Sequence, residues 1–396
     1  MSPAEPPEPA GLYLHVPFCA TVCPYCDFAV RADQRARRER FVASLVTEIE
    51  LAGPDWQLAF DTVHFGGGTP SLLEPRQLAR ILEAVRSGFA LAADTRVTLE
   101  ANPEDVGAER ARAWRALGAG TLSLGVQSFD PRALEFLGRR HTPEGARSAF
   151  AAARAAGFDT VSLDLIYGHP LDSVDRWRAD LEAAMALAPD HISCYQLTVS
   201  EGTLLGKRRR RGELHELEED RQAELFLLTH EFLGERGLHG YEVSNFARSP
   251  AHRSRHNRKY WRHVPYLGLG PSAHSFDGRR RWWNERRLDA WEARLARGER
   301  PVAGEETLAP RDLAVEELML GLRTDEGVDI QGFATRHGND LIAANRDAVA
   351  RLEREGLLEI ARGRLRPTRR GLVVADAIAR AFAVLPGDTP PSPPRS

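Results

Sequence analysis

The sequence predicts an α/β protein that combines a parallel β-sheet with a smaller helical unit at its C-terminal end. Six short β-rich runs alternate with helical patterns in the first half of the chain, and this alternation stops near residue 200. Strands and helices in series favour parallel pairing through crossover helices. An open doubly wound sheet and a barrel or partial barrel both fit six units, since a complete barrel has eight.

The predicted strands and helices follow one another along the chain. The β-rich runs cover residues 12–16, 61–65, 96–100, 121–126, 160–167 and 191–197. After the second run, the apolar residues from Leu78 to Phe89 recur at helical spacing. Further helices are expected at 107–117, 143–156 and 173–188. The order of these segments supports the α/β prediction.

Beyond residue 200 the pattern becomes less regular. The charged stretch 207–220 begins with the basic run Lys207–Arg211 and continues with acidic residues. We interpret it as a solvated loop that compensates its own charge, rather than as a contact for RNA or an anionic ligand. A helix is expected next, followed by an irregular region rich in His, Gly and aromatic residues at 239–283.

A separate unit is predicted from about residue 308 onward. Apolar residues at helical spacing indicate helices near 313–322 and 342–352, and residues 355–368 read as a hairpin that turns near Gly363. Helices followed by a small hairpin resemble a winged helix. The Pro-rich ends, residues 1–10 and 386–396, have little to bury and are expected to be disordered.

Composition limits the classes of function. The 53 Lys and Arg against 56 Asp and Glu give a formal net charge of −3, which disfavours nucleic-acid binding by bulk charge. No apolar run reaches the roughly 18 residues of a membrane span, and no signal-peptide pattern is present. We expect a soluble, cytoplasmic protein without a transmembrane segment, which is compatible with peripheral membrane association.

Three of the four cysteines lie close together, at Cys19, Cys23 and Cys26. Thiolates at this spacing can hold three corners of one [4Fe–4S] cubane and leave the fourth iron open to a substrate or cofactor. A zinc site or unrelated buried thiols are the alternatives, although zinc prefers a fourth ligand. Cys194 is expected to be a buried strand residue rather than the missing ligand.

Polar or Gly-rich residues follow each predicted strand, where parallel α/β sheets form their sites. The turn Gly66–Pro70 lacks the order of a dinucleotide site and the Lys of a P-loop. It is either a tight turn or a place where the backbone approaches a ligand. Glu100, Gln127, Arg139 and Asp164 could bind a zwitterionic, ribose-bearing ligand, or serve in salt bridges and caps.

The segment HNRKYW, residues 256–261, concentrates a histidine, aromatic side chains and cations. Imidazole can ligate haem iron, and Arg or Lys can pair with propionates. His252, His263 and His274 lie nearby in the sequence. The alternative is an ordered loop whose aromatic residues seal the barrel.

Taken together, these motifs resemble a known family. The segment YLHVPFCATVCPYCDF, from Tyr13 to Phe28, is similar to the cluster loop of radical S-adenosylmethionine (SAM) proteins. GGGTPS, EANPE, SLGVQSFD, DLIYGHP and HNRKYW extend the resemblance, over nearly the whole chain, to the oxygen-independent coproporphyrinogen III oxidase group. The resemblance implies a partial (β/α)6 TIM-like barrel with a C-terminal helical, winged-helix-like domain.

The resemblance also implies cofactors and a division of the chain. Cys19, Cys23 and Cys26 would bind the [4Fe–4S] cluster. The implied SAM contacts are Tyr13, Tyr25, Gly67, Gly68, Thr69, Glu100, Gln127, Arg139, Asp164 and Thr198. The expected domains are a radical SAM barrel at 11–240, a connecting region with HNRKYW at 241–305 and the C-terminal domain at 306–385.

Two features indicate a branch of this family. Phe28 stands where coproporphyrinogen dehydrogenases have an additional Cys, and HNRKYW matches the HNxxYW motif of HemW-type haem chaperones. We predict a chaperone that carries a cluster and SAM and passes haem to a client haemoprotein, such as a respiratory one. His256, Asn257, Tyr260 and Trp261 are the expected haem residues. The alternative is a dehydrogenase that decarboxylates coproporphyrinogen III, an activity we expect to be absent.

Overall fold

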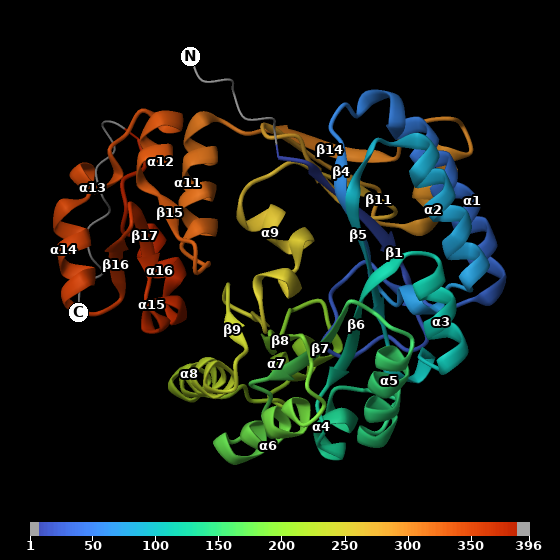
Figure 1. The fold of residues 1–396 in the computed structure, drawn as a ribbon, viewed down its shortest axis with the longest axis horizontal. Helices are drawn as coiled ribbons and strands as arrows, with labels where there is room; N and C mark the ends of the chain where they lie inside the picture. The colour runs from blue at the N-terminus through green and yellow to red at the C-terminus, as the bar shows by residue number, and fades with distance from the viewer. Residues whose placement is uncertain (1–7, 386–396) are drawn as a thin grey trace.

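The computed structural model describes residues 8–385 (Figure 1). Residues 1–7 and the tail 386–396, for which disorder was predicted, lie outside the described residues. Ala10, which falls in the segment predicted to be disordered, already belongs to the first strand and is fully buried.

Six parallel strands form the wall of a partial barrel, in the order of the chain, and the α/β barrel prediction is confirmed. They are β1 (Ala10–Val16), β4 (Phe60–Gly67), β5 (Leu91–Ala101), β6 (Ala119–Gln127), β7 (Thr160–Tyr167) and β8 (His191–Gln196). All six predicted strands are present. Each pairs in parallel with the next, so their carboxyl ends meet at one rim.

Helices cover the outer face of this wall. They are α1 (Arg35–Ala52), α2 (Pro75–Gly88), α3 (Ala108–Ala116), α4 (Pro131–Phe136), α5 (Pro143–Ala155), α6 (Val174–Met185) and α8 (Glu219–Glu235). Helix α2 starts at a capping box, in which Gln77 Oε1 accepts a hydrogen bond of 2.9 Å from the Glu74 amide. The sequence did not single out α1, although Phe41, Leu45 and Ile49 line its buried side.

Residues 239–307, most of which were expected to be irregular, add short strands to both edges of the sheet. They are β9 (His239–Gly240), β10 (Asn245–Ala247), β11 (Tyr266–Leu269), β12 (His274–Phe276), β13 (Arg280–Asn284) and β14 (Val302–Thr307). Helix α9 (Arg255–Trp261) and helix α10 (Leu288–Leu295) lie between them. The expectation was wrong because strands this short form through pairing with distant segments and show little periodicity of their own.

The charged stretch is only partly a loop. Its basic run lies in α7 (Leu204–Arg210), and the acidic residues follow the helix. Arg209 pairs with Glu216 at 2.6 Å, so the segment does compensate part of its charge internally. A two-stranded pair, β2 (Phe18–Cys19) with β3 (Arg31–Ala32), frames the cysteine loop. Short 3-10 turns cover Gly53–Asp55, Pro70–Leu72, Pro103–Asp105 and Pro250–His252.

The C-terminal unit combines helices with a three-stranded sheet, as a winged helix does. Its helices are α11 (Pro310–Gly321), α12 (Ile330–His337), α13 (Leu341–Ala344), α14 (Arg346–Arg354), α15 (Arg369–Val373) and α16 (Ala375–Arg380). Its strands are β15 (Val328–Asp329), β16 (Leu358–Ala361) and β17 (Arg364–Pro367). The predicted hairpin turns at Arg362 and Gly363, both with positive φ.

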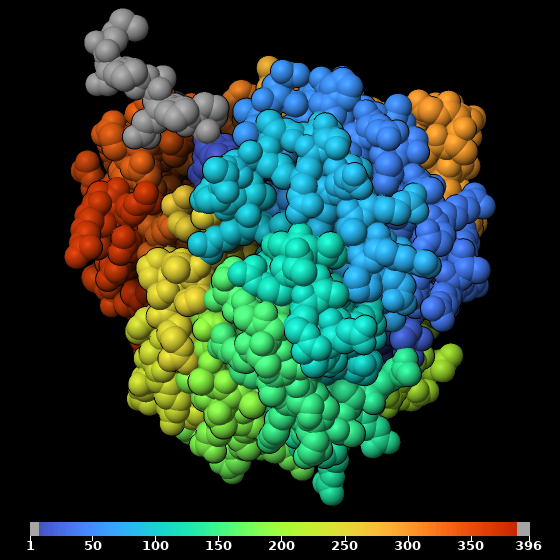
Figure 2. Space-filling model, turned by 45° about the vertical axis from the view of Figure 1, so that its right-hand side comes forward, coloured from blue at the N-terminus to red at the C-terminus, as the bar shows by residue number. Residues whose placement is uncertain are grey.

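Separate apolar clusters stabilise the two parts, and a smaller third cluster around Leu137 and Leu205 also belongs to the barrel. The main cluster fills the space between the barrel wall and its helices, and the C-terminal cluster contains only residues from 314 onward. Helix α9 stands between the parts, and the C-terminal unit lies on one flank, beside the yellow segment that contains α9 (Figure 2). Glu326 accepts from Arg258 at 2.5 Å and from Arg262 at 2.9 Å, which ties the unit to α9. Within residues 8–385, no helix has the length and apolar character of a membrane span.

Candidate functional site

The three clustered cysteines line a cavity of about 490 Å³ at the carboxyl ends of the barrel strands. Cys19 ends β2, and Cys23 and Cys26 follow in a tight turn in which the Cys26 amide donates to the Cys23 carbonyl. All three are free and half-buried. Cys194 is buried in β8, belongs to the main apolar cluster and does not line this cavity.

The glycine turn after β4 packs directly against the cysteine loop. Gly67 has a φ of +104°, which favours glycine. A Cβ on Gly68 would lie 2.6 Å from the Phe18 carbonyl oxygen and 3.1 Å from Cys19 Sγ. Any larger residue at Gly68 would clash with this backbone and crowd Cys19, so glycine is what lets the turn pack directly against the cysteine loop.

The arrangement of donors fits a cluster better than a single ion. Among the residues from 8 to 385, no three His, Cys, Asp or Glu side chains lie close enough to hold one metal ion. A zinc ion needs its ligands to converge in that way, whereas a cubane is held by thiolates on different irons. Burial raises the pKa of the Cys19 thiol to about 11, so binding of iron there releases a proton.

The residues predicted to contact SAM are largely brought together. Nine of the ten line the cysteine cavity. They come from the cluster loop, from β4 to β8 or the residues directly after these strands, and, for Arg139, from the segment after α4. They are Tyr25, Gly67, Gly68, Thr69, Glu100, Gln127, Arg139, Asp164 and Thr198. Tyr13 is the exception, because it points into the lower part of the barrel.

Arg139 and Gln127 have hydrogen-bonding capacity left for a ligand. Arg139 donates to Cys23 Sγ at 3.5 Å, to Asn102 Oδ1 at 2.5 Å and to the Gly125 carbonyl at 2.8 Å. Arg139 Nε and Gln127 Oε1 are nevertheless buried without a partner among the described residues. Gln127 also has a φ of +67° at the end of β6, a conformation that is costly for a residue with a side chain.

The lining also includes polar residues that were not among the predicted contacts, among them Asn102, Ser123 and Tyr195. Asn102 directly follows β5, and its side chain holds Arg139 in place. The sequence could have indicated Asn102, because this residue lies at the end of a predicted strand and within the EANPE motif. Ser123 and Tyr195 lie within strands, so only the direction of their side chains shows that they face the cavity.

Glu100 and Asp164 lie at the border between the cysteine cavity and a second, polar cavity deeper in the barrel. Glu100 Oε1 lies 2.9 Å from His64 Nε2, and Asp164 accepts hydrogen bonds of 3.0 and 3.1 Å from the Ser123 hydroxyl. Burial raises the pKa of Asp164 to about 6. The two carboxyl groups place negative charge and acceptors at the floor of the cysteine cavity.

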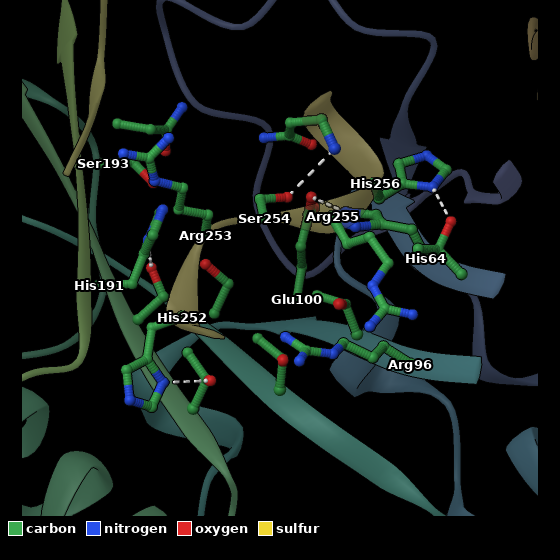
Figure 3. Close-up of a pocket in the computed structure, with 18 of the residues that line it drawn as sticks. His64, Arg96, Glu100, His191, Ser193, His252, Arg253, Ser254, Arg255 and His256 are labelled. Atoms are coloured by element: carbon green, nitrogen blue, oxygen red, sulfur yellow. Dashed lines mark hydrogen bonds and ion pairs between the residues drawn. The ribbon is translucent and has the colours of Figure 1, made fainter. Parts of the chain in front are cut away.

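The deeper cavity, here called the bore, has a volume of about 220 Å³ and is lined mainly by hydroxyl, imidazole and guanidinium groups. Figure 3 shows Ser193, His191 and His252 on one side of the bore, and His64, Arg96 and His256 on the other. Helix α9 contributes His256, Asn257 and Tyr260 to its lining.

His256 is enclosed by protein partners. Its Nδ1 lies 2.9 Å from the Thr62 hydroxyl, and its Nε2 lies 2.8 Å from the Tyr260 hydroxyl. Burial lowers its pKa well below the ordinary value, so the imidazole is neutral. In this conformation neither ring nitrogen is available to an iron. Trp261, the last predicted haem residue, lines neither the bore nor the cysteine cavity.

His252, a second candidate ligand for haem iron, is less constrained than His256. Its Nδ1 lies 2.9 Å from the Thr160 hydroxyl, and among the described residues its Nε2 has no hydrogen-bond partner. It lines the bore from the 3-10 turn ahead of α9. The segment HNRKYW, for which an ordered loop was the alternative interpretation, is thus part of a helix that closes the lower end of the barrel.

Comparisons with known proteins identify relatives over the whole chain. The model of the radical SAM superfamily matches residues 13–184, and that of the HemN C-terminal domain matches residues 308–374. "Heme chaperone HemW" of Mycobacterium tuberculosis is 40% identical over 381 residues, which cover 95% of each chain. "Radical S-adenosyl methionine domain-containing protein 1, mitochondrial" of Bos taurus is 36% identical and covers 95% of this chain and 88% of its own.

A solved structure shares the fold. Coproporphyrinogen III oxidase (HemN) from Escherichia coli superposes with a TM-score of 0.81 over 94% of this chain and 89% of its own, at 21% identity. This likeness confirms the partial barrel with its C-terminal helical domain. At such low identity it carries no information about activity.

Proposed function

The chain belongs to the radical SAM superfamily, in the group of the HemW haem chaperones, and from this we propose that it binds haem and passes it to a client haemoprotein. The observation that carries the proposal is the similarity to proteins named heme chaperone HemW over nearly the full length of both chains. Membership of the superfamily implies a [4Fe–4S] cluster and SAM.

The cofactor residues are proposed from the lining of the cysteine cavity. Cys19, Cys23 and Cys26 would hold the cluster, and the open iron would take the amino and carboxylate groups of SAM. When bound, the pair supplies one-electron chemistry. The role of the protein is to orient SAM. Glu100 and Asp164 would accept hydrogen bonds at the floor of the cavity, and the buried Arg139 Nε and Gln127 Oε1 would supply a donor and an acceptor that no protein atom among the described residues uses.

The roles that we propose for the residues of HNRKYW follow from the hydrogen bonds of His256. Because both nitrogens of His256 are engaged, its contribution is to hold the Tyr260 hydroxyl and to fix α9 against β4 through Thr62. Tyr260 and Asn257 then present the surface of the helix to a ligand. Iron ligation falls to a histidine with a free nitrogen.

We place the protein in the cytoplasm. Its three cavity-lining cysteines are free thiols, and a reducing compartment keeps thiols available for iron.

Haem binding and delivery test the proposal directly. The anaerobically reconstituted protein is titrated with haem, and the complex is mixed with apomyoglobin as the acceptor. We expect a stable Soret band that moves to the myoglobin spectrum faster than haem leaves an albumin complex in the same assay. No Soret band with the reconstituted protein would overturn the proposal.

The dehydrogenase alternative is tested with the same preparation. Phe28, which takes the place of an additional Cys in dehydrogenases, is an exposed apolar ring at the mouth of the cavity and cannot supply a thiolate. We expect no conversion of coproporphyrinogen III with SAM and a reductant. Turnover at a rate comparable with a coproporphyrinogen dehydrogenase assayed alongside would favour the enzyme.

A further inference from the structure

A third pocket, of about 470 Å³, lies beside the cluster loop and is separate from the predicted SAM contacts apart from Tyr13. Strands β1, β11 and β12, helix α9 and the residues that follow Cys26 contribute to it. The side chains on which the inference depends are Tyr13, Phe28, Tyr260, Tyr266, His274 and Arg286. The sequence analysis named Tyr13, Phe28, Tyr260 and His274 separately, but it did not bring them together, because the walls of the pocket come from distant segments of the chain.

Strand register gives the pocket a flat wall. Tyr13 pairs with Gly268 across β1 and β11, and His274 pairs with Trp283 across β12 and β13. The pairing of β11 with β12 places Gly268 opposite His274, so these four positions form one row across the sheet. A Cβ on Gly268 would lie 2.1 Å from the His274 carbonyl oxygen, which requires glycine there. No side chain therefore separates Tyr13 from His274 along this row.

His274 differs from the histidines inside the barrel. It is exposed, and neither of its ring nitrogens has a hydrogen-bond partner among residues 8–385. His15 and His256, by contrast, have both ring nitrogens bonded to protein atoms. The Trp283 ring lies 5.8 Å from the His274 ring and supports it from the next strand. A free, positioned imidazole in an open pocket is the usual protein ligand of haem iron.

Aromatic side chains frame the rest of the pocket. Phe28 is 63% exposed, the largest value among the large apolar residues described, although it lies only two residues beyond Cys26. Tyr260 is fixed by its bond to His256 and by an edge contact with Tyr266 at 4.7 Å. A flat apolar ligand would cover Phe28 and lie against the two tyrosines.

The charged groups at the pocket fit an acidic substituent. Arg286 is exposed, and its only hydrogen bond in the described part of the chain goes to the Asp27 carbonyl at 2.9 Å, so donors remain for a carboxylate. The Asp27 carboxylate also lines the pocket, but it accepts from the Ser200 hydroxyl at 2.9 Å.

We propose that this pocket is the haem site, with His274 as an axial ligand of the iron, Phe28 and Tyr266 against the macrocycle and Arg286 on a propionate. The inference rests on the proposed haem-binding function and specifies where the haem binds. It also gives the HNRKYW segment a role, because His256 positions Tyr260, which forms one wall of this pocket rather than ligating the iron.

His274→Ala tests the axial ligand, and His215→Ala, an exposed histidine on a loop far from the pocket in sequence, is the matched control. Each variant is titrated with haem and with metal-free protoporphyrin IX. His274→Ala is expected to weaken haem binding by about tenfold or more and to shift the Soret band. Protoporphyrin binding should stay close to wild type, because it has no iron to ligate. His215→Ala should bind both as the wild type does.

Added imidazole tests whether the loss of haem binding in His274→Ala comes from the loss of the ring at this position. In His274→Ala, imidazole can occupy the space of the lost ring and should restore the wild-type Soret band. Phe28→Ala should weaken haem and protoporphyrin alike, since it removes contact with the macrocycle. Arg286→Ala should weaken haem more than haem dimethyl ester, which lacks free carboxylates.

Two failures can be told apart. If the wild-type protein binds haem, and His274→Ala binds it with unchanged affinity and spectrum, the site lies elsewhere and only this inference fails. A loss of the Soret band in His252→Ala in place of His274→Ala would move the ligand to the bore. If the wild-type protein binds no haem, the proposed function itself fails.

Discussion

At the scale of single residues, the four cysteines differ in their surroundings. Cys19, Cys23 and Cys26 line a cavity, whereas Cys194 is packed in the main apolar cluster. Replacing any of the first three by Ala should abolish the broad visible absorption and most of the bound iron. The fold should persist, because the apolar core of a barrel this large does not depend on metal.

Cys194→Ala is the control for this prediction. It removes a small buried side chain and should cost about 1–2 kcal/mol of stability while leaving the iron content unchanged. Equal iron loss in Cys194→Ala and Cys19→Ala would show that the three-cysteine assignment is incomplete.

Glu100 is expected to contribute to SAM binding without contributing to the cluster. Its carboxylate lies at the floor of the cysteine cavity, where it can accept hydrogen bonds from hydroxyl or amino groups. Hydrogen bonds to charged groups contribute about 1.5–3 kcal/mol, so Glu100→Ala should weaken SAM binding about 10- to 100-fold. Calorimetry on the reconstituted protein measures this. Glu83→Ala, on the exposed side of α2, should bind SAM normally, and an equal affinity in both variants would place the site elsewhere.

Asp164 provides a prediction about pH. Burial raises its pKa from an ordinary value near 3.8 to about 6, so between these values the folded state binds a proton that the unfolded state does not. The free energy of unfolding therefore falls as the pH rises through this window, because the buried carboxyl group loses its proton. Asp164→Asn removes the effect, and its stability relative to wild type should increase from pH 4 to pH 7 by at most about 1.4 kcal/mol per pH unit.

Urea unfolding at several pH values measures this difference. Asp175→Asn, at an exposed position in the first turn of α6, is the control for the loss of a carboxylate at the surface. A constant difference between Asp164→Asn and wild type would mean that this carboxyl is not perturbed.

At the scale of elements, Glu48 connects α1 to the strands that extend the sheet. It is buried and accepts hydrogen bonds from the Gly270 amide at 2.7 Å, from Asn284 Nδ2 at 2.5 Å and from Trp291 Nε1 at 3.0 Å. Gly270 directly follows β11, Asn284 is the last residue of β13, and Trp291 lies in α10. One side chain thus ties together three elements that are far from it in the sequence.

Removing this carboxylate should be costly. Glu48→Ala leaves the Gly270 amide and Trp291 Nε1 without an acceptor, and Asn284 Nδ2 keeps only the Gly270 carbonyl. At about 1–3 kcal/mol for each unsatisfied group, the loss should reach about 3 kcal/mol or more. Thermal or urea unfolding measures it. Glu50→Ala, on the exposed side of the same helix, should change the stability by less than about 0.5 kcal/mol. Similar values for the two variants would show that water replaces the carboxylate.

At the scale of the whole molecule, the separation of the C-terminal apolar cluster from those of the barrel predicts two structural units. The seven tryptophans all precede residue 308, so tryptophan fluorescence reports on the barrel alone. Phe333 is fully buried in the C-terminal cluster. Phe333→Ala should cost that unit about 3–5 kcal/mol, and the circular dichroism transition should begin at lower urea than the fluorescence transition.

The corresponding change in the barrel is the control. Phe65→Ala, in the buried part of β4, should move the fluorescence transition itself. If Phe333→Ala shifted both signals together, the contacts of Glu326 and Asp325 with the barrel would be strong enough to make the two parts one cooperative unit. The same unfolding measurements test the domain boundaries proposed at residues 240 and 305.

The sequence by itself determined the six parallel strands, the helices that alternate with them after the first, the hairpin of the C-terminal unit and the placing of polar residues after the strands, whereas the full set of SAM contacts came from the family resemblance. These features depend on local periodicity and on the rule that parallel strands present their carboxyl ends at one rim. A residue at the end of a buried strand, such as Glu100, can therefore be assigned to the rim from the strand pattern alone.

Only the tertiary structure decided the strands β9 to β14, the helix that contains HNRKYW and the contacts of its side chains. Short edge strands depend on pairing with segments up to hundreds of residues away, which leaves no local signal. The sequence shows that His256 and His274 are histidines, but not that one has both nitrogens bonded inside the barrel while the other is free in an open pocket. That difference arises from packing between distant segments, and it decides which imidazole is available to a metal.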